Sequence, residues 1–330
     1  MSCRSTYIPL CLLPVLLMLS GCLKDELPVP PHSPGEVITA SVDLEPTYRW
    51  QVYYDLDRSA ITDKHLKTVW DLGFETSAEG FHVILNTSKL MFACNTGNPS
   101  FAEVNDTSGF FRCRKWDEAS GNPDSTAIGD WRGHKNVYLI DRGLSETGQS
   151  LGFRKIKFLE VNDRYYRIRL AHINGSEDTV IQIFKDTSYN FMFLSFDNKG
   201  QVVKAEPPKS EWDLCFTQYT HIFYDTVPVT PYLVTGCLLN RYNTVARMIT
   251  SIPFQDIDFT FASSLELSDA VNTIGYDWKR YDFKAGAYTV LDNRTYVIRD
   301  AEGTYFKLRF IDFYNALGQS GSPRWEYQRL

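Results

Sequence analysis

The 330-residue chain lacks the short patterns that mark the common enzyme classes. It contains no HExxH zinc motif, no GxSxG nucleophile elbow, no Walker A phosphate loop and no GxGxxG dinucleotide turn. Its carboxylates are numerous but scattered, and their spacing pairs no two of them for glycoside hydrolysis. We therefore expect a protein that is not an enzyme.

An excess of positive charge and a membrane-spanning segment are also missing. The formal net charge is −6, so the chain has no basic footprint for nucleic acid. After residue 22 no apolar run is long enough to cross a membrane. No CxxC pair occurs, and a zinc site built on cysteines is therefore not indicated.

Residues 1–21 have the features of a lipoprotein signal peptide. Arg4 precedes an apolar run, residues 7–18, that is short and interrupted by proline. Leu19-Ser20-Gly21-Cys22 resembles the bacterial lipobox, so we expect Cys22 to carry the lipid, including palmitate, and to begin the mature chain. A plain secretory signal with an incidental cysteine is the alternative.

Residues 22–36 are expected to form an acylated tether. Lys24-Asp25-Glu26 is similar to the acidic export tag of Bacteroidetes lipoproteins that face outward from the outer membrane. Four prolines follow between Leu27 and Gly35, and proline-rich segments are stiff and extended. We expect a protein attached to the outer membrane by its lipid alone, facing the outside.

The chain uses one five-residue pattern twice, at Trp70–Phe74 and at Trp212–Phe216. Both read Trp-Asp-Leu-x-Phe, in which every second residue is large and apolar. Such alternation is typical of a half-buried β-strand. The repeated aspartates, Asp71 and Asp213, are expected to be structural hydrogen-bond acceptors rather than catalysts.

Two further segments recur in the same order. Residues 138–142 match 296–300, and residues 155–161 match 307–313 in their sequence of charged and apolar types. Three matches in one order predict two diverged copies of one β unit. The alternative is that an antiparallel protein reuses aromatic strands by chance.

The predicted fold is all-β, with mainly antiparallel sheets and little helix. The division is a first β unit at 37–204 and a second at 205–330, which could be fused into one domain. One short helix is predicted at 264–271, and the loop at 95–131 is expected to be functional or disordered. The main predicted strands are 137–140, 153–161, 165–173, 179–184, 190–196, 212–219, 232–240, 254–261, 288–291, 294–299 and 305–314.

Four cysteines follow the lipidated one. Cys94 and Cys113 flank a loop rich in Gly, Asn and Pro, while Cys215 and Cys237 lie in successive strands and could face one another. An exported protein can oxidise both pairs to disulfides. Buried free thiols that act as small apolar side chains are the alternative.

The strand sequences resemble the HmuY family of the Bacteroidetes. The segments that carry this resemblance are the two Trp-Asp-Leu-x-Phe strands, Tyr232–Asn240, Ile274–Trp278 and Tyr305–Phe313, behind a lipobox. It is closest over residues 205–330, which are similar to the short haemophores, whereas the first half resembles longer members. The resemblance implies a surface lipoprotein that takes haem, free or from a host protein, and passes it to a TonB-dependent receptor.

In the short members two axial His or Met residues hold the haem iron. Met248 falls in the first ligand window here, whereas the second, residues 278–286, offers only Tyr281 and Lys284. Met248 is the first candidate ligand and His221 the second. The candidate pocket walls are Tyr219, Phe254, Trp278 and Tyr281.

Several alternatives stay open at this stage. Haem could bind through one ligand, or through donors from the first half, and no metal besides its iron is expected. The second candidate function is a structural or adhesive surface lipoprotein that keeps the scaffold without haem.

Overall fold

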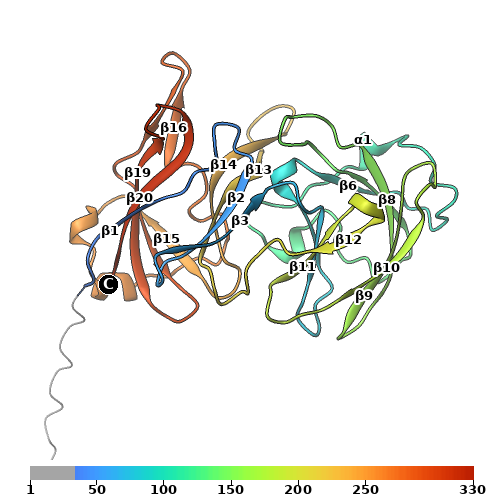
Figure 1. Ribbon diagram of the computed structural model, residues 1–330, viewed down its shortest axis with the longest axis horizontal. Helices are drawn as coiled ribbons and strands as arrows, with labels where there is room; N and C mark the ends of the chain where they lie inside the picture. The colour runs from blue at the N-terminus through green and yellow to red at the C-terminus, as the bar shows by residue number, and fades with distance from the viewer. Residues whose placement is uncertain (1–33) are drawn as a thin grey trace, which may run out of the picture. The chain divides into compact units, whose positions relative to one another are not determined.

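Antiparallel pairing dominates the computed structural model, which describes residues 34–330 (Figure 1). These residues contain 20 strands and only two short α-helices, so the predicted all-β fold is confirmed. The predicted signal peptide, the lipidation site Cys22 and most of the tether lie outside the described residues. None of the helices in the described part is long and apolar enough to span a membrane.

The first copy of the repeat is a pair of sheets with strand orders β10-β9-β8-β7-β6 and β12-β11-β4-β5. Leu72, Phe74, Ile140, Ile156 and Tyr166 are among the buried residues of its core. A loop between β6 and β7 carries α1 (Phe110–Cys113). The strands are β4 (Leu72–Glu75), β5 (Val83–Leu85), β6 (Phe92–Asn95), β7 (Val137–Asp141), β8 (Phe153–Val161), β9 (Tyr165–Ala171), β10 (Thr179–Phe184), β11 (Phe191–Ser195) and β12 (Gln201–Val203).

The second copy has sheets ordered β1-β20-β19-β18-β15 and β14-β13-β2-β3. Its core includes Phe216, Trp278, Phe310 and Trp325. A hairpin of β16 (Lys279–Asp282) and β17 (Ala287–Val290) and the helix α2 (Phe259–Ser263) are added to it. The other strands are β1 (Ile38–Ser41), β2 (Trp50–Asp55), β3 (Ala60–Leu66), β13 (Leu214–Phe223), β14 (Thr230–Leu239), β15 (Val245–Ile249), β18 (Thr295–Arg299), β19 (Tyr305–Tyr314) and β20 (Ser320–Arg329).

The first three strands of the chain pair with the second copy. Strand β1 pairs with β20 and β2 pairs with β13, so the blue β1 lies beside the red β20 in Figure 1. The sequence-based division placed residues 37–66 in the first unit, and this pairing places their strands in the sheets of the second. The error arises because strand pairing is non-local and leaves no trace in local alternation. The boundary at residue 204 itself stays a prediction.

Strand registers support the predicted duplication. Leu139 of β7 faces Lys155 of β8, as Val297 of β18 faces Lys307 of β19. The isolated bridges Ala93–Lys115 and Ala246–Ser268 also correspond, since both alanines face an isoleucine of the next strand. Strands β4–β12 therefore correspond in order to β13–β15, β18–β20 and then β1–β3. The second copy is a circular permutation that takes its last three strands from the start of the chain.

The repeated aspartates hold equivalent strands together, as predicted for structural acceptors. Asp71 donates its N–H to Leu194 O at 2.8 Å and accepts from Phe196 N at 2.7 Å. Asp213 donates to Tyr54 O at 2.9 Å and accepts from Leu56 N at 2.8 Å. The motif thus recurs because each copy needs its aspartate to join two neighbouring strands of one sheet.

The helix and one predicted strand are placed differently by the structure. Residues 264–271 contain no helix, and the predicted strand 254–261 contributes instead to α2 and a short 3-10 turn. The cause is Asp258, whose side chain accepts a hydrogen bond from Phe261 N at 2.8 Å and so caps the start of α2. This polar cap outweighs the apolar composition of the segment.

The loop at 95–131 and the cysteines are ordered. Phe101 and Phe110 are buried, and a disulfide joins Cys94 to Cys113. The possible bond between Cys215 and Cys237 is absent, and both thiols are free and buried. Because Cys237 pairs with the residue after Cys215, the two thiols point to opposite faces of their sheet.

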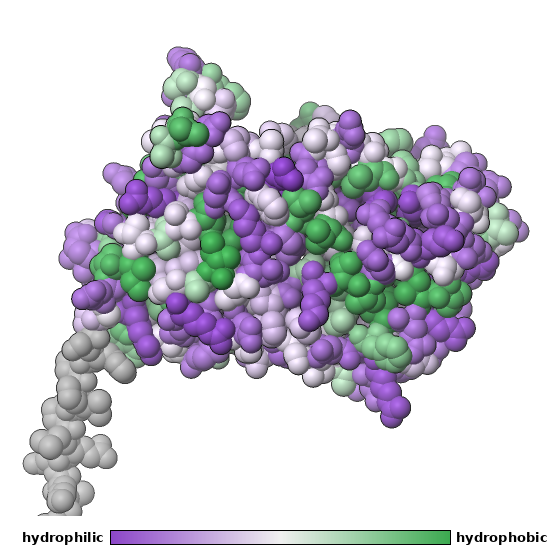
Figure 2. All heavy atoms as spheres, in the orientation of Figure 1, coloured by the Kyte–Doolittle hydropathy of each residue, from purple (hydrophilic) through white to green (hydrophobic). Residues whose placement is uncertain are grey.

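The face of the molecule seen in Figure 2 is mostly hydrophilic, with apolar residues in narrow patches between charged ones. The large apolar side chains are therefore held mainly inside the two cores.

Candidate functional site

The two predicted haem ligands lie near one ion pair in the second copy. Met248 is on β15, and its sulfur is 3.6 Å from Nη1 of Arg294, the residue before β18. Arg294 forms an ion pair with Asp277. His221 is on β13, and its ring centroid is 5.0 Å from that of Tyr276. We call these five residues the His221–Met248 cluster.

His221 is suited to coordinate a metal because its ring is kept neutral. The imidazole is half-buried, and its Nδ1 is buried without a hydrogen-bond partner. Burial lowers the pKa of His221, although the carboxylate of Asp277 acts in the opposite direction. A neutral imidazole has the free lone pair that a metal ion requires.

Met248 is not a core residue. Its side chain is 37% exposed, whereas Ala246 and Ile249 on the same strand are buried. It faces Tyr296 across the β15–β18 pair, and the hydroxyl of Tyr296 is buried without a hydrogen-bond partner. The thioether is therefore accessible at the rim of the second copy, next to a buried polar atom that lacks a partner.

The four predicted wall residues are in four different settings. Trp278 is 1% exposed and stacks on Phe310 at 3.9 Å, so it belongs to the core. Phe254 lies under the cationic group of Lys307 at 4.8 Å. Tyr281 is 40% exposed on the β16–β17 hairpin, and Tyr219 is buried against a separate cavity. His221 contacts Tyr276, and the next residue, Asp277, pairs with the arginine beside Met248, whereas the four aromatic residues are not gathered around either candidate ligand.

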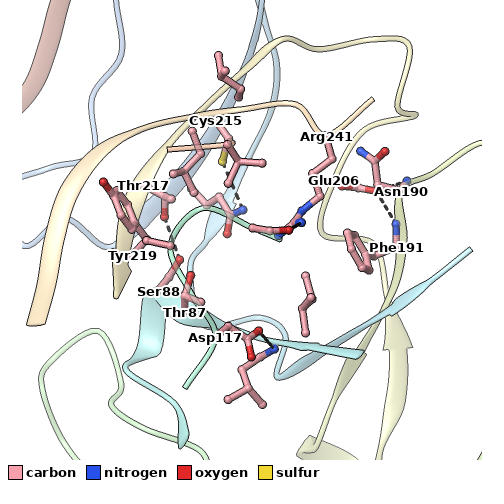
Figure 3. Close-up of a pocket in the computed structure, with 18 of the residues that line it drawn as sticks. Thr87, Ser88, Asp117, Asn190, Phe191, Glu206, Cys215, Thr217, Tyr219 and Arg241 are labelled. Carbon is pink, nitrogen blue, oxygen red and sulfur yellow. Dashed lines mark hydrogen bonds between the residues drawn. The ribbon is translucent and has the colours of Figure 1, made fainter. Parts of the chain in front are cut away.

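That separate cavity, of about 110 Å³, lies between the two copies (Figure 3). Two of its three acidic lining residues, Asp117 and Glu206, are buried. Glu206 accepts hydrogen bonds from the backbone of Asn190 at 2.7 Å and Phe191 at 3.0 Å. Burial raises the pKa of Glu206 to about 7 and that of Asp117 to about 6. The cavity is too small for a porphyrin, but it holds two carboxyl groups that titrate near neutral pH.

A larger groove of about 840 Å³ shares part of this lining, and we call it the inter-copy groove. His82 lines it and is fixed by Glu75, whose Oε2 is 2.6 Å from His82 Nδ1. Such a carboxylate partner orients a histidine for metal binding through its other nitrogen. The volume lies within the range of small-molecule sites. Other residues that line the groove are Thr76, Tyr189, Asn190, Phe191, Lys209, Arg241, Asp269 and Val271.

Sequence reasoning missed the polar groups of both cavities. Nothing in the sequence shows that Glu75 lies across the β4–β5 turn from His82. One available signal was the acidic residue that directly follows the Trp70–Phe74 pattern. Glu206 and Asp117 carry no such signal, because only tertiary packing buries them.

Residues 231–327 match the family model for HmuY protein. The resemblance seen in the strand sequences is thereby confirmed for this HmuY segment, which runs from β14 to β20. The segment contains Met248 and Arg294 and begins after His221. No curated protein matches the chain.

Solved structures align with most of the chain at low similarity. The crystal structure of apo PinO from Porphyromonas gingivitis is 9% identical, covers 89% of this chain and 97% of its own, and has a TM-score of 0.26. The apo HmuY analog from Tannerella forsythia is 10% identical, with coverages of 90% and 98% and a TM-score of 0.25. A HmuY-like heme binding protein from Bacteroides vulgatus is 11% identical, with coverages of 88% and 90% and a TM-score of 0.20. TM-scores this low carry no information about the position of a site.

Proposed function

We propose that this chain is a surface lipoprotein that binds haem. The observation that carries the proposal is the match of residues 231–327 to the HmuY family, because the matched segment contains the exposed thioether of Met248. Haem would supply an iron that accepts sulfur and nitrogen donors. The chain would supply the ligands, the orientation and the counter-charge for the propionates.

The His221–Met248 cluster offers groups for each of these tasks. Met248 and His221 are the proposed axial donors, and the neutral state of His221 suits it to that role. Arg294 could exchange its ion pair with Asp277 for a haem propionate. The rings of Tyr276 and Phe223, 5.0 and 4.8 Å from that of His221, are apolar surfaces of the kind a porphyrin packs against.

We further propose that the protein works in haem acquisition. Acylation at Cys22 would hold it at the outer membrane, from where it would pass haem to a TonB-dependent receptor. The sequence of residues 19–26 supports this location. A structural or adhesive lipoprotein without haem is the second candidate, and the expectation that the chain is not an enzyme stays a prediction.

A haemin titration of the mature chain without its lipid, residues 23–330, tests the proposal. A saturable, sharpened Soret band is expected. Met248→Ala and His221→Ala should each weaken binding by about tenfold or more, because each removes one bond to iron. His82→Ala, in the inter-copy groove, is the matched control and should bind as the wild type does.

Two other outcomes would correct the proposal. The absence of any saturable spectral change would favour the lipoprotein without haem. A loss of binding in His82→Ala, with none in the other two variants, would keep haem binding and move its site to the inter-copy groove.

A further inference from the structure

The first copy neutralises its repeated aspartate with two cations. Asp71 is fully buried, and Arg142 donates from Nε and Nη2 to its two oxygens, both at 3.0 Å. Lys89 forms a second ion pair with Asp71. Arg142 also reaches Asp197 at 2.9 Å. Two carboxylates and two cations therefore meet where β7 and β11 end.

The second copy has carboxylates where the first has this arginine and its partner. Asp300 corresponds to Arg142. Asp300 directly follows β18 and Arg142 directly follows β7, and these two strands are equivalent in the two copies. Asp57 corresponds to Asp197, since the residue before each donates its N–H to the repeated aspartate. The ion pair of the first copy is thus replaced by two groups of the same charge.

The lysine of the first copy is replaced as well. Counting back from the aligned strands β6 and β15, Lys89 corresponds to Tyr242. Among the described residues, Asp213 has no ion-pair partner. Asp213 has the same place in the fold as Asp71, but no cation pairs with its carboxyl group.

Three carboxylates converge at this place. One oxygen from each of Asp57, Asp300 and Glu302 lies within 4.8 Å of the others. Asp300 is only 2% exposed, and its Oδ1 accepts a hydrogen bond from Thr304 N at 2.7 Å. Its Oδ2 is buried without any hydrogen-bond partner. Asp300 is thus a buried carboxylate close to two others, with one oxygen that lacks the partner its burial requires.

The neighbouring cations do not supply that partner. Arg58 Nε is 3.5 Å from Asp55, and Arg329 Nη1 is 3.9 Å from Asp57, but both side chains are mostly exposed. Exposed ion pairs of this kind contribute little. Lys209 lines the adjacent cavity of about 180 Å³, together with Asp55, Asp57, Asp213 and Glu302. In the described part of the chain no ion pair reaches Asp300 or Glu302.

We propose that Asp57, Asp300 and Glu302 bind a divalent cation of the calcium class. The donors are all oxygen, and calcium prefers six to eight oxygen ligands in a flexible arrangement. Asp55 and Asp213 line the adjacent cavity, which leaves room for water ligands. The ion takes the position that the Arg142 guanidinium fills in the first copy. The proposal is independent of haem binding.

The neighbouring carboxylates also act on the pKa values of the two buried aspartates. Burial raises the pKa of Asp300 to about 6, and Asp57 adds to the rise. Burial raises the pKa of Asp213 to about 8, with Asp300 and Asp55 contributing. A cation at the site would remove the cause of both rises, because it stabilises the ionised forms.

The test compares the full chain in EDTA and in millimolar calcium chloride. Calcium should raise the melting temperature by about 5 °C or more, because it binds the folded state alone. Terbium, which occupies calcium sites, should give luminescence sensitised by Trp212, a lining residue of the adjacent cavity. Magnesium should bind at least about tenfold more weakly, since it requires a tighter octahedral site.

Variants separate binding from folding. Asp300→Asn and the exposed Glu302→Gln should abolish the calcium shift and the terbium signal, while melting in EDTA at or above the wild-type temperature. Asp197→Asn, at the corresponding place in the first copy, is the matched control and should keep the full calcium response. A wild type that does not respond to calcium, variants that keep the response, or magnesium binding as tight as calcium would each overturn the proposal.

Discussion

Asp71 and Asp213 are the same residue of one repeat in opposite electrostatic surroundings. Burial raises the pKa of Asp71, but Lys89 and Arg142 more than offset it, so the pKa is held below its usual range. Burial raises the pKa of Asp213 to about 8, and the acidic neighbour Asp300 adds to this. The same substitution at the two sites should therefore have opposite effects.

Asp71→Asn should lower the free energy of unfolding by about 3–5 kcal/mol, because it leaves buried Lys89 without its anion and Arg142 with the exposed Asp197 alone. Asp213→Asn keeps the acceptor for Leu56 N and removes a buried charge, so in EDTA at pH 8 it should be neutral or stabilising. Urea unfolding of both variants measures the contrast. Equal destabilisation of the two would show that their surroundings do not differ as described.

Glu206 gives a pH dependence with a defined sign. Its folded pKa of about 7 is above the ordinary value of 4.5, so the folded state holds more protons between these values. Stability from this group is therefore greatest at low pH, falls as pH rises from about 4.5 to about 7, and stays low above that.

Glu206→Gln should remove this dependence. Its amide oxygen still accepts from the backbone of Asn190 and Phe191, so the variant should exceed the wild type at pH 8 by up to about 3 kcal/mol. At pH 4.5 the difference should be close to zero. Chemical unfolding at the two pH values tests it, and a pH-independent difference between wild type and variant would contradict the assignment.

At the scale of elements, the loop between β6 and β7 is fixed by one covalent bond. Cys94 and Cys113 are 19 residues apart in the sequence. The part of the loop that follows Cys113 places Asp117 and Gly121 in the wall of the small cavity between the two copies. The double variant Cys94→Ala, Cys113→Ala should have a free energy of unfolding about 3 kcal/mol lower, as expected for a closed loop of this length.

Reduced wild type should match the double variant in urea unfolding, and the variant itself should not respond to reductant. An unchanged midpoint would show that packing of Phe101 and Phe110 holds the loop without the bond.

Local sequence patterns predicted most strands but not the partners of the elements. The strand at Trp212–Phe216 was predicted because the alternation of apolar and polar residues is a local signal. The capped helix at Phe259 was missed because one side-chain hydrogen bond from Asp258 decided it. Cys215 and Cys237 were expected to be able to face one another because they lie in successive strands, but the register of β13 and β14 is a tertiary property.

The candidate site shows the same limit. Met248 was chosen because it falls in a ligand window implied by the family resemblance, with His221 as the second candidate. Neither choice could show that Tyr276 contacts His221 or that Asp277 pairs with the arginine beside Met248. Trp278 was assigned to a pocket wall, although a large aromatic residue fits a core equally well.

At the scale of the whole molecule, the second copy is completed by the start of the chain. Ile38 of β1 pairs with Tyr327 of β20, and Gly35 N donates to Arg329 O at 2.9 Å. The C-terminal end of β20 therefore lies beside the segment that leads into β1. A short linker could join them as a hairpin, and the second copy would become continuous in sequence.

This arrangement predicts which fragments fold. Residues 205–330 alone lack β1–β3, which leaves the edges of β13 and β20 unpaired, so the fragment should be unfolded or aggregated. The same fragment joined through a short glycine linker to residues 35–66 should unfold cooperatively. Circular dichroism during urea unfolding compares them, and cooperative unfolding of residues 205–330 alone would contradict the permuted repeat.

The central functional claim is that haem binds in the second copy between Met248 and His221. The most direct measurement is the iron anomalous difference map of a crystal of the chain grown with haemin. The account predicts a single iron peak within bonding distance of the Met248 sulfur and a His221 ring nitrogen. A peak beside His82 in the inter-copy groove, or no ordered iron at saturating haemin, would contradict it.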